Sequence, residues 1–466
     1  MFEAYHLPVA SASDISDFNV FRVRNVDWRT PILSPAAVAR IAHALRQRRA
    51  HALARRHVAS IIQSIDVVAR RFRDPADPVR READALLPAV TGYAPGMAAH
   101  VLDRMARGWS GDVLERLVRA ELGNADVLDR FVPDPVRGVN VFAAGPDVIL
   151  HILSGNVPGV AVTSLVRALL VKSASLAKTA FDEPVLAVLF ARALADVDHD
   201  LASCLAITYW PGGDIERERA AMEHVDAVLL YGGADAQRAV RDRLPPGVAY
   251  IEHGPRISFG IVAREALSND DTARTLADSV ARATATFDQQ GCVSPHVVYV
   301  ESGGHITPRL FASMVADALD ETERALPSGS LSPEEAAAIH SIRAGVEFRA
   351  IAGEDVEVFA PANGFATVIF EADVTFTASP LNRVLQVKPV ADVQEIPGLV
   401  ARARSLLQTV AVAAPAVRIA GLAPRLVASG VTRITTFEAM PFPPPYWQQD
   451  GRGPLRELVR WAEQEG

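Results

Sequence analysis

The stretch Phe287–His296, FDQQGCVSPH, holds one of the two cysteines in a chain of 466 residues. Cys292 lies there between an expected helix, Asp271–Thr286, and a short β-prone run, Val297–Glu301. Gly291 lets the backbone come close to a bound substrate, and backbone amides beside the cysteine can hold an oxyanion. A polar loop of this kind suits a nucleophilic thiol. The alternative is that Cys292, like most free cysteines, is a small buried hydrophobe.

Composition argues against several classes of function. A net charge of −8 and a pI near 5.9 disfavour a nucleic-acid or anionic-membrane partner. Two cysteines cannot build a disulfide framework, and no uncharged apolar stretch reaches the ~18 residues that span a bilayer. The start of the chain, MFEAYHLPVASASD, lacks the basic flank and apolar core of a signal peptide. The expected protein is cytoplasmic, without a membrane span and, since no metal-ligand spacing occurs, without a metal site.

From Gly138 onward, short β-prone runs alternate with amphipathic helical runs, which is the pattern of parallel βαβ units. The expected strands are Val139–Ala143, Val148–Leu153, Ser175–Thr179, Leu205–Trp210, Ala227–Tyr231, Val248–Glu252 and Ser258–Val262. Several of them end in a small or polar residue, and in an open parallel sheet ligands bind beyond the carboxyl ends of the strands. The sequence therefore predicts an α/β protein with a doubly wound, nucleotide-binding parallel-sheet lobe, although the GxGxxG fingerprint is missing.

The length of the chain and its local sequence patterns predict three parts. Residues 1–256 form N-terminal helices and the nucleotide-binding lobe, and residues 257–430 form an α/β catalytic lobe that carries Cys292. Residues 431–466 form a tail that packs back on the lobes or on a neighbouring subunit. Two helices are expected late in the chain, at Ile396–Leu407 and Leu455–Glu463.

Four motifs near the expected strand ends carry candidate site residues. Asn156 in SGNVPGV can donate its amide N–H to an oxyanion, or it simply tolerates a left-handed turn. Lys172 in LVKSAS can hold ribose hydroxyls or a phosphate, or it is merely solvated. The pair Gly232 and Gly233 in YGGAD opens a helix and suits a pyrophosphate. Glu252 and the histidine after it, in YIEHGP, are candidates for general acid–base work, or are packed residues.

The order of these motifs resembles that of the aldehyde dehydrogenase superfamily, and most closely the acyl-CoA reductase family typified by the LuxC component of bacterial bioluminescence. The resemblance covers about residues 148–301, through GNVPGV, LVKSAS, WPGGD, YGGAD, HGPRISFGIV and FDQQGCVSPH. It is looser over Leu381–Val390, over GVTRI at Gly430–Ile434 and over DGRGPLRELVRW. It implies an aldehyde dehydrogenase-like fold, with a nucleotide-binding lobe and an α/β catalytic lobe.

The resemblance also implies roles for single residues. Cys292 matches the nucleophile that carries the acyl group as a thioester. Asn156 matches the side-chain donor of the oxyanion hole, beside the backbone N–H of Cys292, and Lys172 matches the cofactor lysine. Glu252 falls where hydrolytic members keep their general base. No match is found to the second glutamate of those members, and Gln449 stands before the Asp-Gly of the C-terminal motif, where the family often has a histidine.

The choice of coenzyme follows from the same resemblance. In the superfamily the residue three after the cofactor lysine lies near the adenosine ribose, where an acid favours NAD. Here that position is Ser175, which is small and neutral. A carboxylate would repel a 2′-phosphate, whereas Lys172 and the hydroxyl of Ser175 can pair with it. NADPH is therefore the expected coenzyme, with a modest selectivity over NADH.

The resulting hypothesis is a reductase that converts an acyl-CoA or acyl-carrier thioester to an aldehyde through a Cys292 acyl-enzyme. It is expected to work as a homo-oligomer or in a complex with an acyl-transfer partner. One alternative is a hydrolytic aldehyde dehydrogenase, in which Glu252 activates water. The other is a non-catalytic scaffold subunit of an acyl-transfer complex.

Overall fold

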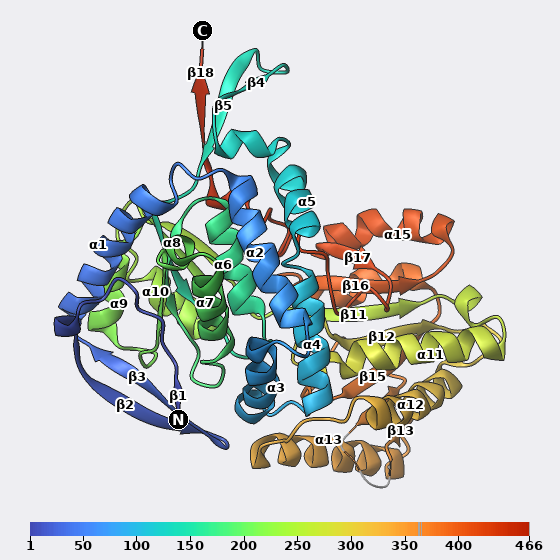
Figure 1. Cartoon of the computed structure of the whole chain (residues 1–466). Coiled ribbons are helices and arrows are strands. Elements are labelled where there is room, and N and C mark those ends of the chain that lie inside the picture. Colours follow the sequence, from blue (N-terminus) through green and yellow to red (C-terminus); the bar gives the residue numbers. More distant parts are fainter. Residues whose placement is uncertain (362–363, 365, 466) are drawn as a thin grey trace. The chain divides into compact units, whose positions relative to one another are not determined.

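The computed structural model describes residues 1–361, 364 and 366–465 (Figure 1). The chain forms two compact units. The first unit comprises Met1–Thr91, Ala98–Gly254 and Pro444–Gly466, and the second comprises Gly92–Met97 and Pro255–Pro443. The sequence predicts that the first lobe ends at residue 256, and the structure ends the corresponding part of the first unit at Gly254. The expected tail, residues 431–466, is divided: residues 431–443 belong to the second unit and the rest to the first.

The first unit is built on a five-stranded parallel sheet. In spatial order its strands are β10 (Ala249–His253), β9 (Ala227–Tyr231), β6 (Val148–Ile152), β7 (Ala174–Lys178) and β8 (Leu205–Thr208). The chain runs outward from β6 through β7 to β8 and resumes on the other side of β6 with β9 and β10. The strand order therefore reverses between β6 and β9, and open parallel sheets bind ligands at such a switch point.

Helices follow these strands, as the alternating sequence pattern predicts. They are α6 (Val160–Leu170), α7 (Leu186–Val197), α8 (His199–Ala202), α9 (Ile215–Met222) and α10 (Ala234–Arg241). Every residue of β6, β7, β8 and β9 is buried, which means that both faces of the sheet are covered. This explains why the strands are continuous apolar runs and do not alternate with polar residues.

The remaining elements of the first unit come from both ends of its sequence. The N-terminal part holds β1 (Phe2–Glu3), β2 (Ile15–Val23), β3 (Val26–Leu33), α1 (Pro35–Ala52), α2 (Val58–Arg73), α3 (Pro78–Thr91), α4 (Pro95–Arg107) and α5 (Gly111–Leu122). A separate three-stranded sheet joins β4 (Val132–Asp134), β5 (Val139–Ala144) and β18 (Arg460–Gln464) (Figure 1). The helix expected at Leu455–Glu463 is wrong, because only a single short turn forms at Arg456–Leu458 and the end of the segment, from Arg460, pairs antiparallel with β5 as part of β18.

A seven-stranded sheet forms the centre of the second unit. Its order is β13 (Val356–Phe359), β14 (Thr367–Glu371), β15 (Val384–Val390), β12 (Pro295–Glu301), β11 (Ile257–Val262), β16 (Leu407–Ala413) and β17 (Arg433–Thr435). The helices of this unit are α11 (Asp270–Ala285), α12 (Pro308–Ala325), α13 (Pro333–Ile351), α14 (Ile396–Val400) and α15 (Ala416–Ala428). Residues of α11 and α12 share one apolar cluster with the sheet, and residues of α14 and α15 share another. The helix expected at Ile396–Leu407 ends early, and the apolar strand β16 follows it.

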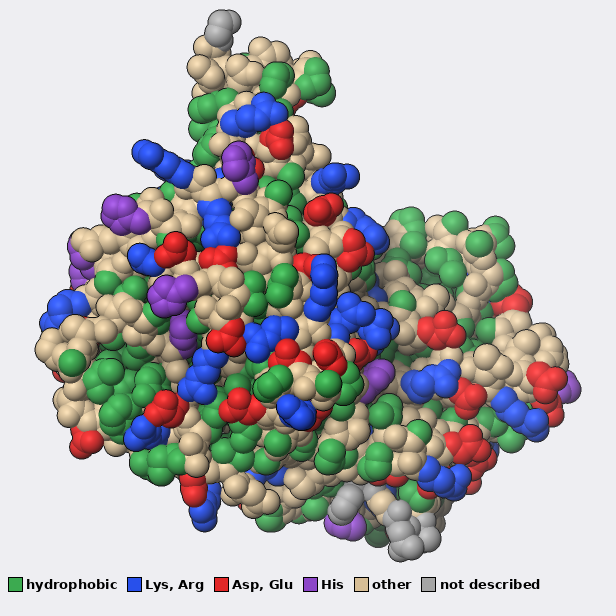
Figure 2. Space-filling view, in the orientation of Figure 1, with side chains coloured by type: hydrophobic (Ala, Val, Ile, Leu, Met, Phe, Trp, Pro, Cys, Tyr) green, Lys and Arg blue, Asp and Glu red, His purple; other side chains and the backbone are tan. Residues whose placement is uncertain are grey.

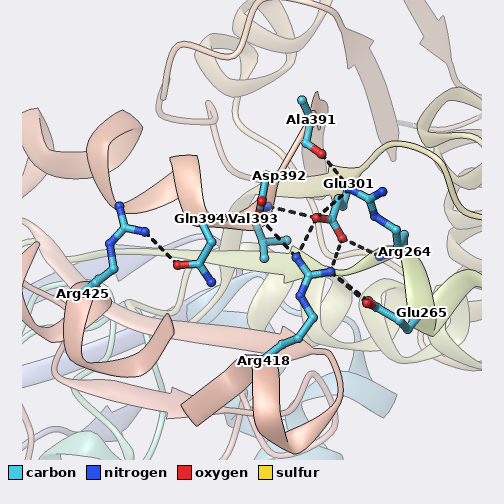
Figure 3. A network of polar contacts seen from close by, with 9 residues as sticks. All are labelled: Arg264, Glu265, Glu301, Ala391, Asp392, Val393, Gln394, Arg418 and Arg425. Atoms are coloured by element: carbon cyan, nitrogen blue, oxygen red, sulfur yellow. Dashed lines mark hydrogen bonds and ion pairs between the residues drawn. The ribbon is translucent and has the colours of Figure 1, made fainter. Parts of the chain in front are cut away.

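The strand β12, which follows the Cys292 loop, ends in a buried carboxylate. Glu301 accepts hydrogen bonds from the backbone N–H groups of Arg264, at 3.0 Å, and Val393, at 3.3 Å. The two terminal nitrogens of Arg418 on α15 donate to its two oxygens, at 2.6 and 2.7 Å (Figure 3). These hydrogen bonds hold the pKa of the Glu301 carboxyl at about 2, against the opposing effect of burial. Glu301 therefore ties the end of β12 to the turn after β15 and to α15.

The surface charges are mixed in sign. On the face drawn in Figure 2, basic and acidic side chains are interspersed over the molecule. Some are neighbours on one helix turn, such as Arg107 and Asp103 on α4, whose nearest nitrogen and oxygen are 2.9 Å apart. Among the described residues, no helix has the length and hydropathy that crossing a bilayer requires.

Candidate active site

The Cys292 loop leaves α11 through an unusual turn. Phe287, Asp288 and Gln289 all have left-handed backbones, with φ of 60°, 47° and 64°. Such a conformation costs about 1–2 kcal/mol for each residue that has a side chain. Functional sites are where backbone strain of this kind is most often retained. Cys292 follows three residues later and is partly buried, at the start of the segment that leads into β12.

Ser258 on β11 fixes the backbone at Cys292. Its hydroxyl donates a 2.8 Å hydrogen bond to the carbonyl oxygen of Cys292 and accepts one of 3.1 Å from the N–H of Thr409 on β16. Thr409 is in turn the register partner of Arg433 on β17. Two neighbouring strands, β11 and β16, therefore fix the backbone at Cys292.

Arg433 is a buried cation whose charge interacts with that of Cys292. Its two terminal nitrogens donate to the carbonyl oxygens of Met440, at 2.9 Å, and Ala439, at 2.6 Å, which anchor the guanidinium. Burial lowers the pKa of Arg433 to about 10, and a negative charge on Cys292 opposes that shift. A nearby cation is one of the settings in which cysteine thiols act as nucleophiles. In the sequence, Arg433 appears only within the GVTRI motif of the family resemblance, which gives no indication of a role near Cys292.

The other cysteine has no comparable surroundings. Cys204 is fully buried, and burial raises the pKa of its thiol to about 12. Its thiol is therefore an inert part of the core, as its apolar sequence context predicts.

In the first unit, two predicted groups lie on either side of the switch point. Asn156 is exposed in the loop between β6 and α6, and Gly159 closes this loop with φ of 95°. Gly232 and Gly233 lie between β9 and α10, and an added Cβ at Gly233 would meet nothing within 4 Å. The loop thus leaves room for a ligand at the amino end of α10, where backbone N–H groups favour an anion.

Lys172 lies at the opposite end of the sheet. It precedes β7, is buried, and its ammonium nitrogen is 2.6 Å from Oδ1 of Asp129. Its carbonyl oxygen accepts a 3.0 Å hydrogen bond from Nε of Arg49. The position before a strand is the amino end, whereas ligands bind at the carboxyl ends. The structure thus contradicts a cofactor role for Lys172, whose charge is used in an internal ion pair.

Ser175 is likewise an interior residue. It is the second residue of β7, has no exposed surface, and its hydroxyl lies 3.1 Å from Nε2 of His151. The other ring nitrogen of His151 lies 2.8 Å from the hydroxyl of Ser164 on α6. Burial lowers the pKa of His151 to about 3, which keeps the ring neutral between the two hydroxyls. Ser175 therefore packs between sheet and helix and does not face a coenzyme ribose.

Lys178 is the lysine at the carboxyl end of β7, and sequence reasoning missed it. Its ammonium nitrogen lies 5.7 Å from the centre of the Tyr209 ring. Burial lowers its pKa, and Glu218 opposes that shift. The signal was present in the sequence, since Lys178 falls at the end of the strand expected at Ser175–Thr179.

Glu252 lies in β10, at the edge of the sheet, and Arg241 of α10 donates a hydrogen bond to its Oε1. An ion pair of this kind leaves the carboxylate less available as a general base. The next residue, His253, has Nδ1 2.8 Å from Oδ2 of Asp450, and its ring stacks on Tyr231 with centres 4.7 Å apart. The C-terminal Asp-Gly motif therefore belongs with the end of β10 in the first unit.

Comparison with known proteins identifies the family of the chain. The model of the acyl-CoA reductase (LuxC) family matches residues 53–461. The chain belongs to the LuxC family of acyl-CoA reductases. A LuxC-family relative from Aliivibrio fischeri, a long-chain acyl-protein thioester reductase, is 30% identical over 423 residues, which cover 87% of this chain and 82% of the relative. A second reductase of that name, from Photobacterium phosphoreum, is 27% identical over 390 residues, which cover 80% of this chain and 74% of the relative.

The solved structures that resemble this LuxC-family chain are aldehyde dehydrogenases. The NADP-dependent glyceraldehyde-3-phosphate dehydrogenase from Bacillus halodurans, complexed with NADP, superposes with a TM-score of 0.73 at 14% identity and covers 100% of this chain and 99% of that chain. A NAD-dependent benzaldehyde dehydrogenase from Corynebacterium glutamicum gives a TM-score of 0.69 at 14% identity, with coverage of 100% and 99%. At this identity the likeness shows the fold, and it confirms the expected aldehyde dehydrogenase-like α/β architecture.

Proposed function

We propose that this protein reduces an acyl thioester, carried by CoA or by an acyl carrier, to an aldehyde, with NADPH as reductant and Cys292 as nucleophile. Membership of the LuxC family supports the reaction, and the names of the relatives point to long acyl chains. The observation that carries the proposal is the setting of Cys292, which has a backbone fixed by Ser258 and an electrostatic interaction with the guanidinium of Arg433.

In this mechanism the Cys292 thiolate attacks the thioester carbonyl carbon. The amide N–H of Asn156 and the backbone N–H of Cys292 stabilise the oxyanion of the tetrahedral intermediate, a contribution of about 3–4 kcal/mol for one donor. The carbonyl then reforms, the carbon–sulfur bond to CoA or the carrier breaks, and that thiolate leaves. An acyl group remains on Cys292 as a thioester.

The second half of the reaction reduces this acyl-enzyme. A bound nicotinamide coenzyme supplies the hydride. The hemithioacetal on Cys292 then collapses, which releases the aldehyde and returns the thiolate. No water has to be deprotonated in either half, so Glu252 can remain in its ion pair with Arg241.

Residues at the carboxyl end of the five-stranded sheet fit a dinucleotide. The backbone at Gly232 and Gly233, with the start of α10, suits the pyrophosphate, and Lys178 suits a ribose or its phosphate. Lys178 replaces Lys172 in this role. The superfamily rule that the residue three later faces the ribose then selects Phe181, which is neutral like Ser175. The expected preference for NADPH is retained on this revised basis.

A homo-oligomer is the proposed assembly, with a complex with an acyl-transfer partner as the alternative. The strand β18 pairs with β5 on one side only, and all its residues are exposed. Such an unpaired edge offers backbone hydrogen bonds to another chain. The two free cysteines suit the reducing conditions of the cytoplasm, which is the proposed location.

Mass spectrometry of the intact protein, incubated with a panel of acyl-CoAs and without coenzyme, tests the proposal. The wild type and the Cys204→Ala control should each gain the mass of one acyl group, and Cys292→Ala should gain none. Addition of NADPH should then release the aldehyde. Full turnover by Cys292→Ala would rule out a mechanism through a Cys292 thioester.

The same assay separates the two alternatives. Acid formed from an aldehyde with oxidised coenzyme, in place of aldehyde formed from acyl-CoA, would identify a hydrolytic aldehyde dehydrogenase. A wild type that gains no acyl mass from any donor would identify a scaffold subunit.

A further inference from the structure

A second left-handed turn lies against the turn that precedes Cys292. Leu381, Asn382 and Arg383, directly before β15, have φ of 70°, 56° and 63°. The N–H of Asn382 donates a 3.1 Å hydrogen bond to the carbonyl oxygen of Asp288, in the middle of the first turn. Two runs of three non-glycine residues in this conformation are therefore in direct contact. Neither is favoured by its own sequence, so contacts with the surroundings must hold both.

Arg383 makes the central contact between the two turns. Its Nε donates a 2.8 Å hydrogen bond to Oδ1 of Asp288, and the side chain is 1% exposed. Its Nη1 donates to Oε2 of Glu323, at 2.5 Å, and to the carbonyl oxygen of Leu326, at 2.9 Å. The guanidinium thereby connects the nucleophile turn to the end of α12. The planar guanidinium donates to three acceptors at once. The ammonium group of a lysine, at the end of a flexible chain, could not reproduce this geometry.

Two glutamines extend this connection toward Cys292. Gln289 is fully buried; its Nε2 donates to the carbonyl oxygen of Val384, at 2.9 Å, and its Oε1 accepts from the N–H of Val384, at 2.9 Å. Gln290 donates from Nε2 to Oδ1 of Asn382, at 2.9 Å. Asp288 and Gln290 are thus bonded to the second turn, and Gln289 is bonded to Val384, the first residue of β15. Gly291 and Cys292 come next.

We propose that Arg383 is a positioning residue for Cys292, because its guanidinium holds the left-handed turn Phe287–Gln289 in the form that aims the thiol at the substrate carbonyl. Loss of the guanidinium releases Asp288, and the turn then relaxes toward ordinary backbone angles. A displacement of about 1 Å at a reacting atom slows a reaction roughly 100-fold. The inference rests on the proposed function, in that Cys292 is taken as the nucleophile.

The test compares Arg383 with a matched buried cation on the same strand. Lys388 of β15 is also fully buried, and its Nζ lies 2.6 Å from Oε2 of Glu371 and 2.8 Å from the carbonyl oxygen of Asp373. Neither partner belongs to the nucleophile loop. The variants Arg383→Met, Arg383→Lys and Lys388→Met are mixed with acyl-CoA without coenzyme, and acylation of Cys292 is followed by mass over time. Circular dichroism and thermal unfolding show which variants are folded.

Folded Arg383→Met and Arg383→Lys should acylate about 10- to 100-fold more slowly at saturating acyl-CoA, with an unchanged half-saturating concentration. Lys388→Met should lose thermal stability but acylate at the wild-type rate. Wild-type acylation by Arg383→Lys, or equal slowing in Lys388→Met, would overturn the proposal. A wild type that is never acylated would instead refute the proposed function, so the two failures are distinct. Should Arg383→Met not fold, Arg383→Lys, which keeps the charge, decides the question.

Discussion

The ammonium group of Lys172 lies 2.6 Å from the carboxylate of Asp129, while Lys178, at the other end of the same strand, lies beside the ring of Tyr209. Only the second lysine is at the carboxyl end of the sheet, where a coenzyme binds. Lys178→Met should therefore raise the KM for NADPH about tenfold, with a smaller effect on stability. Lys172→Met should leave this KM unchanged and lower the free energy of unfolding by about 3 kcal/mol, because it breaks a buried ion pair. Steady-state kinetics and urea unfolding of both variants check this, and the opposite pattern would restore Lys172 as the cofactor lysine.

Arg433→Met removes a cation whose charge interacts with that of Cys292. An opposite charge at close range shifts a titration by roughly 1–3 pH units, so the pH midpoint for alkylation of Cys292 by iodoacetamide should rise by roughly 1 unit. Arg425→Met is the matched control, since Arg425 of α15 is in the same unit and donates to Gln394, at 2.7 Å. Cys204 does not interfere, because it is buried. If the pH midpoint of alkylation is the same in Arg433→Met as in the wild type, the guanidinium only supports the loop that contains Met440.

Asn156→Ala should lower kcat by about 100- to 1,000-fold and leave the KM for acyl-CoA nearly constant, because an oxyanion donor acts in the transition state. Pre-steady-state acylation should slow to the same extent. A variant in which only KM rises would make Asn156 a substrate-positioning residue.

Glu252→Gln should reduce thioester reduction far less than Cys292→Ala does. The carboxylate already has a partner in Arg241, and acyl transfer to a thiol needs no base to activate water. The measurement is aldehyde formation from acyl-CoA and NADPH. Loss of activity as complete as in Cys292→Ala would favour the hydrolytic alternative.

Glu301→Gln tests the carboxylate at the end of β12 (Figure 3). Its pKa is about 2 in the folded protein, below the ordinary 4.5, so the ionised group stabilises the fold above pH 4.5, and this stability is lost as the pH falls toward 2. The loss corresponds to about 3 kcal/mol over the whole range. The wild type should therefore exceed Glu301→Gln in urea stability at pH 7, and the difference should shrink by roughly 1 kcal/mol at pH 3.5. A difference that does not change with pH would assign the effect to packing.

Sequence reasoning identified the parallel sheet and most of its loops because apolar strands and glycine-bearing ends are local signals. The strand expected at Ser175–Thr179 is within one residue of β7, yet the lysine before it was chosen over the lysine that ends it. The direction of a strand decides which end meets a ligand, and a short motif such as LVKSAS does not carry that information. Strand β16 was missed because the expected helix at Ile396–Leu407 ran up to its first residue.

The left-handed turns could not be predicted in the same way. Asp288 and Arg383 are 95 positions apart, and each lies in a run of three left-handed residues, which no local sequence favours. Their geometry results from contacts between distant segments. Arg433 is a similar case, since its relation to Cys292 depends on the order of β11, β16 and β17 across the sheet. Local patterns therefore point to Cys292 as a candidate nucleophile but not to the residues that support it.

The first unit contains residues from both sides of the second, since Pro444–Gly466 returns to it and β18 pairs with β5. During translation, Pro255–Pro443 leaves the ribosome before that returning segment does. The unit with Cys292 can thus form its internal contacts while β5, which also pairs with β4, still lacks β18 and His253 still lacks Asp450. Nascent-chain folding should consequently finish with the first unit, although most of that unit is synthesised first.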